Sequence, residues 1–453
     1  MIRIVMILFF TCACFIMQAQ VNIITTIAGT DSFGYSGDNG AATNAKLKAP
    51  EGVCLDKLGN IYIADAGNNR IRKIDITTGI ITTIAGNGTA GYLGDNDVAI
   101  NAELWAPEAF CIDSAGDMYI ADALNHRIRK ITVATGIITT IAGTGVAGDI
   151  GDGNPATDAE LNGPSSVCVD KYGNIYIADY YNNKIRKINS TTGIISTIVG
   201  SGAQGYFGDG ALAINAALYG PLEVVTDSVG NIFISDQWNN VVRRVDATTG
   251  IITTIAGNGT LGYSGDNSDA TDAHLSQPAG LFIDKDNNIF IADYGNGSIR
   301  KITGSGITSS GEVTGVITTV AGKGVTGFFG DGGPATNAKL FCSDVCFDTY
   351  GNMIIADYEN NRIRKVNNAL AVNQFNKTNE LALFPNPTKG KFIVQTTSGN
   401  AEIFISTIAG EKVYRITSHS KETPVDISNQ PPGVYMVYVQ CDEGRFVSKV
   451  VVE

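Results

Sequence analysis

Histidine is scarce in this 453-residue chain, which has only His126, His274 and His419. A zinc centre built on imidazole ligands needs several histidines gathered on one face of a fold. His419 belongs to a C-terminal region of different composition, which leaves two histidines in distant segments. The sequence therefore disfavours a histidine-based metal centre.

Positive charge is also in short supply. The chain has 32 Lys and Arg against 44 Asp and Glu, a net charge of −12 and a pI near 4.8. Proteins that bind phosphate backbones cluster Lys and Arg on one surface. We therefore expect no nucleic-acid partner.

Long hydrophobic runs are absent after the first twenty residues. Arg3 precedes an apolar stretch, Ile4–Met17, which ends at the small residue Ala19. This pattern predicts a secretory signal at residues 1–20, cleaved near Ala19 or Gln20. A membrane anchor is the alternative, but the run is short for one and no second span follows, so no transmembrane segment is expected in the mature chain.

A sustained helical period is missing, and a repeat takes its place. The stretch TIAG or a variant ends at Gly29, Gly86, Gly143, Gly200, Gly257 and Gly322. The first four steps are 57 residues long, and the fifth is longer by an insertion around Gly304–Thr314. A fixed period of this length indicates a repeat architecture.

One repeat has the pattern of four short strands. In the first copy these are Gly52–Asp56, Asn60–Asp65, Arg70–Asp75 and Ile80–Gly86, with β-branched composition and Gly/Asn/Thr turns between them. The unit is therefore predicted to be a four-stranded antiparallel sheet, and the class all-β.

The ends of the array predict a closed ring. A spare strand, Ile23–Gly29, precedes the first copy, while nothing similar follows Arg362–Val366 in the sixth. Pairing these two segments would complete the sixth sheet and remove the exposed edges of a linear array. The prediction is a six-bladed β-propeller closed by its N-terminal strand.

Each copy carries one further mark, which appears as IADAGNNRI, IADALNHRI, IADYYNNKI, ISDQWNNVV, IADYGNGSI and IADYENNRI. In this respect the chain resembles NHL-repeat proteins over residues 21–368. The resemblance implies a propeller but no single activity, because the family includes binding platforms for peptides and RNA as well as a zinc-dependent lyase.

The chain changes character after the sixth copy. Residues 369–380 are polar and unpatterned, which predicts a linker. Residues 381–453 contain alternating strands and PNP and PPG turns, which indicate a small β-sandwich. This segment resembles the type A C-terminal sorting domain of type IX secretion, through PNPTKG, IAGEKV, PPGVYMVYV and SKVVVE. The resemblance implies the type IX secretion machinery as a partner and delivery to the outer-membrane surface of a bacterium or the extracellular space.

Eight cysteines do not predict a disulfide framework. Cys54, Cys111, Cys168 and Cys346 occupy the same position in four different repeats, so they are expected to be small packing residues that do not pair. Cys342 and Cys441 also have no evident partner.

Internal repetition separates scaffold from site. Residues present in every copy are expected to serve the repeat, because turn-forming Asp and Asn bind local backbone and an Arg near an Asp forms a fixed pair. These residues are Asp65, Asp122, Asp179, Asp236, Asp293 and Asp357; Asn68, Asn125, Asn182, Asn239, Asn296 and Asn360; and Arg72, Arg129, Arg186, Arg243, Arg300 and Arg364.

A second repeated signature, GYSGDNGAATNAKL at Gly34–Leu47, carries one aspartate in every copy. Its oxygen-rich loops leave calcium open as a ligand, although the spacing is not that of an EF-hand loop. We favour turn-forming aspartates beside glycine. The aspartates are Asp38, Asp95, Asp152, Asp209, Asp266 and Asp331.

Residues that differ between copies form the candidate site. They fall in the loops before the innermost strands and in the turns between second and third strands, which share one face of a propeller. They are the acids Glu51, Glu108, Glu223 and Asp344, the aromatic residues Trp105, Tyr219 and Phe341 before the innermost strands, and the turn residues Tyr180, Tyr181, Trp238, Tyr294 and Tyr358.

Aromatic rings beside carboxylates suit a glycan or a cationic peptide segment. The expected function is a secreted or cell-surface binding or adhesion module without catalytic residues or a resident cofactor. The alternative is a hydrolase or lyase with a carboxylate-based metal site on the same face, in which calcium is held by Glu51, Glu108, Glu223 or Asp344. The sequence indicates no pair of a nucleophile and a base for such chemistry.

Overall fold

The computed structural model describes residues 22–307, 313–368, 382–396, 400–407, 412–441 and 444–453. Contacts within the chain define two compact units, Met1–Asn368 and Ala369–Glu453. The predicted signal at 1–20 and the predicted linker at 369–380 lie outside the described residues.

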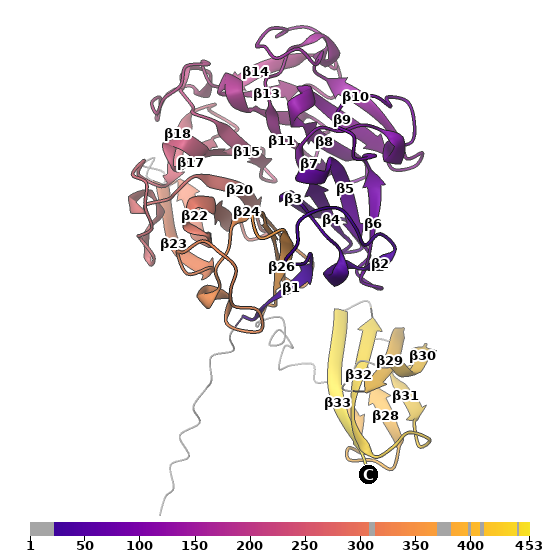
Figure 1. The fold of residues 1–453 in the computed structure, drawn as a ribbon. Helices are drawn as coiled ribbons and strands as arrows, with labels where there is room; N and C mark the ends of the chain where they lie inside the picture. Colours follow the sequence, from indigo (N-terminus) through magenta and orange to yellow (C-terminus); the bar gives the residue numbers. More distant parts are fainter. Residues whose placement is uncertain (1–21, 308–312, 369–381, 397–399, 408–411, 442–443) are drawn as a thin grey trace, which may run out of the picture. The chain divides into compact units, whose positions relative to one another are not determined.

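Six separate sheets make up the first unit, and each contains the four antiparallel strands expected from one repeat (Figure 1). The first three, from the innermost strand outward, are β3 (Pro50–Leu55), β4 (Ile61–Asp65), β5 (Arg70–Ile74) and β6 (Ile80–Ala85); β7 (Pro107–Ile112), β8 (Met118–Asp122), β9 (Arg127–Thr132) and β10 (Ile137–Ala142); β11 (Pro164–Val169), β12 (Ile175–Asp179), β13 (Lys184–Ile188) and β14 (Ile195–Val199). The other three are β15 (Pro221–Thr226), β16 (Ile232–Asp236), β17 (Val241–Val245) and β18 (Ile252–Ala256); β20 (Pro278–Ile283), β21 (Ile289–Asp293), β22 (Ser298–Ile307) and β23 (Val313–Ala321); β24 (Cys342–Phe347), β25 (Met353–Asp357), β26 (Arg362–Val366) and β1 (Ile24–Ala28).

The ring is closed by the N-terminal strand, as predicted. β1 pairs antiparallel with β26, with Ile24 opposite Val366 and Thr26 opposite Arg364. The innermost strands contact their neighbours around the whole circle, and β24 contacts β3. Figure 1 shows the resulting circle of sheets. The first unit is therefore the six-bladed propeller that the repeats indicated.

The blades differ in small additions. In blade five the hairpin strands β22 and β23 are 10 and 9 residues long, whereas the third strands of the other blades have five or six. This is where the sequence placed the insertion, and residues 308–312 of its turn lie outside the described residues. Short strands β2 (Gly40–Ala41) and β19 (Ser268–Asp269) pair with the outermost strands of blades one and five.

Single turns of 3-10 helix occupy the loops. One set precedes each innermost strand: η1 (Ala42–Asn44), η3 (Ala99–Asn101), η5 (Ala156–Asp158), η7 (Ala213–Asn215), η9 (Ala270–Asp272) and η11 (Ala335–Asn337). A second set joins the second and third strands of blades one to five: η2 (Ala66–Asn68), η4 (Ala123–Asn125), η6 (Tyr180–Asn182), η8 (Gln237–Asn239) and η10 (Tyr294–Asn296). Among the described residues, helices are thus limited to three-residue turns, far too short to cross a membrane.

A buried arginine ties each blade together. In blade one, the side chain of Arg72 is fully buried, and its guanidinium lies 3.2 Å from Asp65 and 2.6 Å from Asp38. The same Asp–Arg–Asp bridge recurs in all six blades. It joins the strand-end aspartate, the repeated arginine and the aspartate of the second signature. The repeated Asp and Arg are therefore structural, as expected. The second-signature aspartates, predicted only as turn formers, also neutralise the outer side of this arginine.

The strand-end aspartate also fixes two loops. Asp65 accepts hydrogen bonds from the Asn68 side chain and, at 2.8 Å, from the backbone N–H of Lys48. Asn68 also donates to the Gly34 carbonyl at 2.7 Å. Asp, Asn and Arg thus provide most of one another's hydrogen bonds in a buried region, which is how buried charge is tolerated.

In five blades, a hydrogen bond links the end of the turn between the second and third strands to the next blade. A residue with positive φ ends the turn, and its side chain accepts the N–H of a residue beside the next innermost strand. The pairs are Asn69 with Ala106, His126 with Gly163, Asn183 with Gly220, Asn240 with Gln277 and Asn361 with Ala49, at 2.9–3.1 Å. His126 accepts through Nδ1, and burial beside Arg127 lowers the pKa of its imidazole. That histidine is part of the scaffold.

Cys54, Cys111, Cys168, Cys342 and Cys346 are free thiols, half-buried or buried. Burial raises the pKa of the Cys54 thiol to about 12, which makes it a weak nucleophile. The side chain of Cys441 and residues Cys12 and Cys14 lie outside the described part of the chain.

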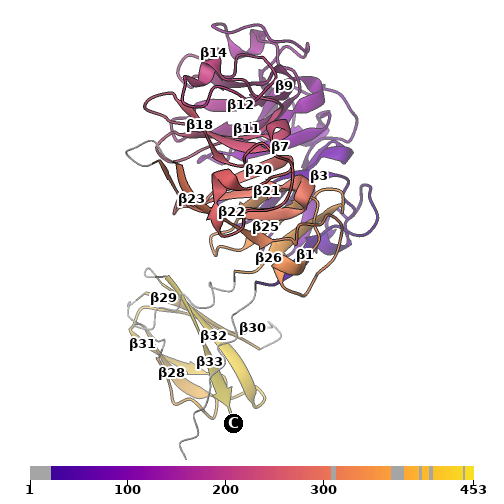
Figure 2. The same ribbon diagram turned by 90° about the vertical axis from the view of Figure 1, so that its left-hand side faces the viewer.

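Two sheets form the second unit (Figure 2). One contains β27 (Ala382–Phe384), β28 (Lys391–Gln395) and β31 (Glu422–Asp426), and the other β30 (Lys412–Ser418), β29 (Ala401–Thr407), β32 (Gly433–Cys441) and β33 (Gly444–Val452). Their core includes Phe392, Ile403, Val437 and Val450, which lie on alternating positions of the strands. A small β-sandwich was the predicted form of this segment.

Candidate functional site

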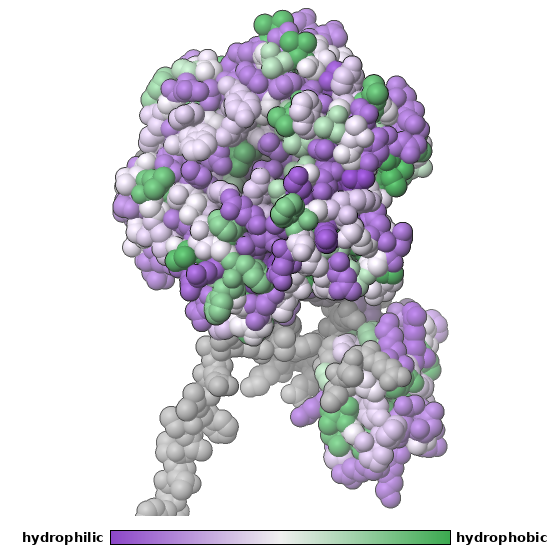
Figure 3. Space-filling view, in the orientation of Figure 1, coloured by the Kyte–Doolittle hydropathy of each residue, from purple (hydrophilic) through white to green (hydrophobic). Residues whose placement is uncertain are grey.

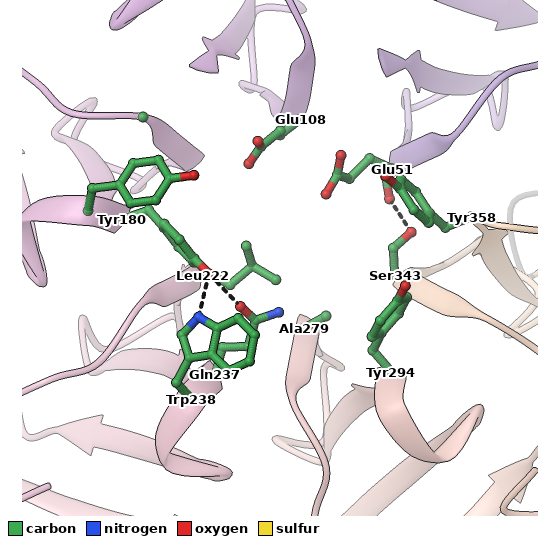
Figure 4. A pocket seen from close by; sticks show the side chains of 12 residues that line it. Glu51, Glu108, Tyr180, Leu222, Gln237, Trp238, Ala279, Tyr294, Ser343 and Tyr358 are labelled. Carbon is green, nitrogen blue, oxygen red and sulfur yellow. Dashed lines mark hydrogen bonds between the residues drawn. The ribbon is translucent and has the colours of Figure 1, made fainter. Parts of the chain in front are cut away.

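A cavity of about 260 Å³ opens on the face formed by the turns between second and third strands (Figure 4). Its lining combines residues that begin the innermost strands with residues of those turns. They are Glu51, Glu108, Gly163, Tyr180, Tyr181, Leu222, Gln237, Trp238, Ala279, Tyr294, Ser343 and Tyr358. The wider face, turned toward the viewer in Figure 3, carries apolar side chains in separate small groups between hydrophilic ones.

A β-bulge directs residues into the axis of the propeller. In blade one, Pro50 pairs with Asp65 and Val53 with Ile63, so Glu51 and Gly52 lie opposite the single residue Ala64. A bulge of this kind re-aims side chains near sites, and every innermost strand has a register shift at this point. The residues beside the strand-opening prolines therefore line the axis.

Two carboxylates form one side of the cavity. Glu51 on β3 and Glu108 on β7 are half-buried, and both project into the cavity in Figure 4. Burial and the negative charge of Asp344 raise the pKa of Glu51 to about 7. Burial and the nearby Glu51 raise the pKa of Glu108 well above its usual value. Each acid thus disfavours ionisation of its neighbour.

Aromatic side chains line much of the rest of the cavity, and Tyr358 lies beside Glu51 in Figure 4. The Trp238 indole N–H donates to the Tyr180 hydroxyl at 2.6 Å, and that hydroxyl donates to Gln237 at 2.9 Å. The rings of Tyr294 and Tyr358 lie 6.3 Å apart in an edge-to-face arrangement. The Tyr294 hydroxyl donates to Glu359 at 3.0 Å. Hydrogen bonds and ring contacts therefore hold these side chains in place before any ligand arrives.

Below these residues the axis narrows to a space of about 20 Å³, which also contacts Glu223 and Asp344. Ser166 donates a hydrogen bond to Glu223 at 2.6 Å. Asp344 accepts the backbone N–H groups of Val53 and Val345 at 2.8 and 2.7 Å. These deeper acids are therefore bound to the scaffold and join neighbouring blades.

Most of the predicted site residues come together. Glu51, Glu108, Tyr180, Tyr181, Trp238, Tyr294 and Tyr358 line the cavity, and Glu223 and Asp344 line its floor. Trp105, Tyr219 and Phe341 do not line either space. Trp105 is 45% exposed on the surface, Tyr219 lies 6.2 Å from the Trp238 ring, and Phe341 is half-buried.

Gln237 is a lining residue that the sequence analysis missed. It holds the repeat position of Ala66, Ala123, Tyr180, Tyr294 and Tyr358. The same comparison between copies could have found it, because its amide breaks the symmetry as clearly as a ring does. The prediction included only aromatic residues of these turns and therefore omitted Gln237.

Among the described residues, no group of three or more His, Cys, Asp or Glu side chains is arranged to hold a metal ion. Glu51 and Glu108 offer two acids, while Glu223 and Asp344 are engaged in hydrogen bonds. The lining offers carboxylate acceptors, an amide and rings, which are groups suited to binding.

Comparison with known proteins identifies both units. A secretion system C-terminal sorting domain matches residues 382–453, and a teneurin NHL domain matches residues 30–92 and 145–205. The chain is an NHL-repeat propeller protein with a C-terminal sorting domain. The sorting domain implies the type IX secretion machinery and secretion to the cell surface or outside the cell.

Relatives of the NHL propeller are much longer than the aligned region. Protein SUPPRESSOR OF QUENCHING 1 from Arabidopsis thaliana is 30% identical over 58% of this chain and 26% of its own length. Human NHL repeat-containing protein 2 is 27% identical over 58% of this chain and 40% of its own length. Mouse Teneurin-4 is 26% identical over 84% of this chain and 14% of its own length.

Two solved structures from Bacteroides thetaiotaomicron share the fold. One is a protein of unknown function, with 20% identity and a TM-score of 0.55 over 76% of this chain and 75% of that chain. The other is an auxiliary nutrient binding protein, with 17% identity and a TM-score of 0.55 over 76% of each chain.

Proposed function

We propose that the NHL propeller is a non-catalytic binding or adhesion module, carried to the surface of a bacterium or released from it, whose glycan or peptide ligand occupies the central cavity. One observation carries this proposal. The repeated residues are consumed by the scaffold, whereas the cavity gathers residues that differ from blade to blade. Sixfold repetition alone would not produce acids on two blades and rings on the others.

The chemistry of the lining favours binding over turnover. Tyr180 and Tyr294 are held by hydrogen bonds to Gln237 and Glu359, and Ser343 donates to the Glu51 carbonyl at 2.7 Å. Of these hydroxyls only that of Tyr294 meets a carboxylate, Glu359, and burial together with that carboxylate raises the pKa of Tyr294, which disfavours its use as a nucleophile. Rings that stack and acids that accept hydrogen bonds are the features of a recognition site.

An array of glycans and peptides, probed with residues 21–453 with and without calcium, tests the proposal. We expect capture of a defined group of ligands, no chemical change in them, and loss of capture in Trp238→Ala. Hydrolysis or elimination of a ligand would instead support a hydrolase or lyase with a carboxylate-based metal site. Equal capture by Trp238→Ala would exclude the cavity as the binding site.

A further inference from the structure

The cavity and its floor gather carboxylic acids without basic partners. Four carboxylic acids line the two spaces: Glu51, Glu108, Glu223 and Asp344. Within the described part of the chain, no Lys, Arg or His lines either of them. Elsewhere in the propeller, each buried acid of the Asp–Arg–Asp bridges faces a guanidinium. The axis is therefore a place where the scaffold supplies acids without their counterions.

The four acids are not equivalent. Glu223 accepts a hydrogen bond from Ser166, and Asp344 accepts two backbone N–H groups. The carboxylates of Glu51 and Glu108 have no hydrogen-bond donor among the described residues. Since both project into the larger cavity in Figure 4, their acceptor capacity is directed at whatever occupies it.

The aromatic residues of the lining complement a cation as well. Tyr180, Tyr294 and Tyr358 hold the turn position at which blades one and two have Ala66 and Ala123, and Trp238 follows Gln237 in the turn of blade four. Aromatic faces attract cations through the ring quadrupole, and the attraction grows when the cation is partly desolvated. The acids and the rings of one cavity thus favour the same kind of ligand.

We propose that the cavity recognises an ammonium group, which donates hydrogen bonds to Glu51 and Glu108 while its carbon skeleton packs against Tyr180, Trp238, Tyr294 and Tyr358. This inference rests on the proposed binding function and names the chemistry of its ligand. A volume of about 260 Å³ accommodates one such group with its adjoining carbons, and the rest of the ligand lies outside. An amino sugar and a lysine side chain both present this chemistry.

Matched pairs of probes isolate the ammonium group. Glucosamine and glucose differ only in an amine and a hydroxyl. Nα-acetyl-lysine amide and Nα-acetyl-norleucine amide differ only in the terminal amine, and they represent the peptide source. Trp105 is the only tryptophan besides Trp238 and does not line the cavity, so Trp105→Phe leaves Trp238 as a single fluorescent reporter.

In the Trp105→Phe background of residues 21–453, we expect the amine member of at least one pair to bind about tenfold or more tightly than its neutral partner. Glu51→Gln and Glu108→Gln should each weaken that amine by about tenfold and leave the neutral partner unchanged. Asp286→Asn, at an exposed turn, is the matched control and should change neither affinity.

Tyr358 separates the ring from its hydroxyl. Tyr358→Phe keeps the aromatic face and should retain amine binding, whereas Tyr358→Leu removes it and should weaken binding about fivefold. The titrations follow the fluorescence of Trp238. If this fluorescence does not change on binding, isothermal titration calorimetry measures the affinities instead.

The outcomes distinguish this inference from the proposed function beneath it. Equal binding of amine and neutral partners, abolished by Trp238→Ala, would overturn the ammonium assignment while the binding site stands. Tight calcium binding that depends on Glu51 and Glu108 and excludes amines would also overturn it. Failure of all four probes would overturn it too, and ligands captured on the array independently of Trp238 would remove the cavity from the proposed function.

Discussion

The periphery of each blade and the axis of the propeller treat charge in opposite ways. In the blades, each fully buried arginine lies between two aspartates, and the arrangement is repeated six times. At the axis, Glu51 and Glu108 have no basic partner among the described residues, and only these two blades have an acid at this repeat position. Removing one partner of a buried ion pair is strongly destabilising, so the blades keep theirs. The axis retains uncompensated acids, which is understandable where a ligand supplies the missing charge.

Deleting residues 21–29 tests whether the repeated part is a closed ring. The deletion removes β1, uncovers the edge of β26 and takes the buried residues Ile24 and Ala28 from the core. We expect the free energy of unfolding to fall by about 5 kcal/mol or more. Thermal unfolding against residues 21–453 measures the change. An unaltered melting temperature would mean that β1 does not close the ring.

Asp179→Ala breaks the comparison on its structural side. It leaves the buried guanidinium of Arg186 without the aspartate 3.2 Å away, and should cost about 3–5 kcal/mol. Asp152→Ala is the matched control, because its side chain is 48% exposed and water can replace it at a cost of about 1 kcal/mol. Urea unfolding of both variants gives the two values. Equal costs would contradict the view that the inner aspartate carries the framework.

Trp238→Ala breaks the comparison on its functional side. The indole is 45% exposed and lines the cavity, so we expect a ligand to lose about 2 kcal/mol of binding energy. Stability should change less than in Asp179→Ala, because the lost contacts are mainly the hydrogen bond to Tyr180 and the ring contact with Tyr219. Melting temperature and affinity are measured on the same protein. A variant that unfolds while Asp179→Ala stays stable would reverse the assignment of scaffold and site.

Replacing Asn183 tests a weaker part of the framework. Asn183→Gly keeps the positive φ of 54° but removes the acceptor for the Gly220 N–H, and should cost about 1–2 kcal/mol. Blade five already has Gly297 at this position, and a Cβ there would meet the Leu340 carbonyl at 2.4 Å. Gly297→Asn should therefore destabilise the propeller as well. Thermal unfolding that improves in Gly297→Asn would show that the missing contact can be restored.

The smallest expected effect is a dependence of stability on pH at the axis. The pKa of Glu51 is raised from 4.5 to about 7, so the folded protein holds a proton that the unfolded chain has lost between these values. Stability from this group is therefore greatest below pH 4.5 and falls as the pH rises to about 7. Glu51→Gln should raise the melting temperature at pH 8 by about 2 °C and leave it unchanged near pH 4. An equal shift at both values would point to a cause other than ionisation.

The repeat made the fold accessible from sequence. Six copies placed every blade, and the spare strand at Ile23–Gly29 predicted the pairing seen between β1 and β26. The sequence repeat was sufficient to predict the blades, because equivalent residues of each copy have the same local environment. The Asp–Arg–Asp bridge was only half predicted. Asp38 and Arg72 are far apart in sequence, and the 2.6 Å contact depends on how a loop folds back over its own blade.

The site was harder to predict than the scaffold. Symmetry breaking selected Glu51, Glu108 and the turn aromatics, which line one cavity, but it also selected Trp105, Tyr219 and Phe341, which do not. All of these lie near the same loops in sequence. What separates them is the β-bulge, which aims Glu51 at the axis, while the residues before the strand-opening position remain outside. The type of residue does not predict the direction in which its side chain points at a β-bulge.

The pairing of β1 with β26 also sets the order of events during synthesis. The partner of Ile24 is Val366, so the ring has no means of closing until the sixth repeat has been made. The sorting domain at residues 382–453 follows directly in chain order. A product that stops before Arg362 has β1 but lacks β26, with which β1 pairs, and it also lacks the sorting domain. The strand that allows the ring to close and the domain that directs secretion are thus made one soon after the other.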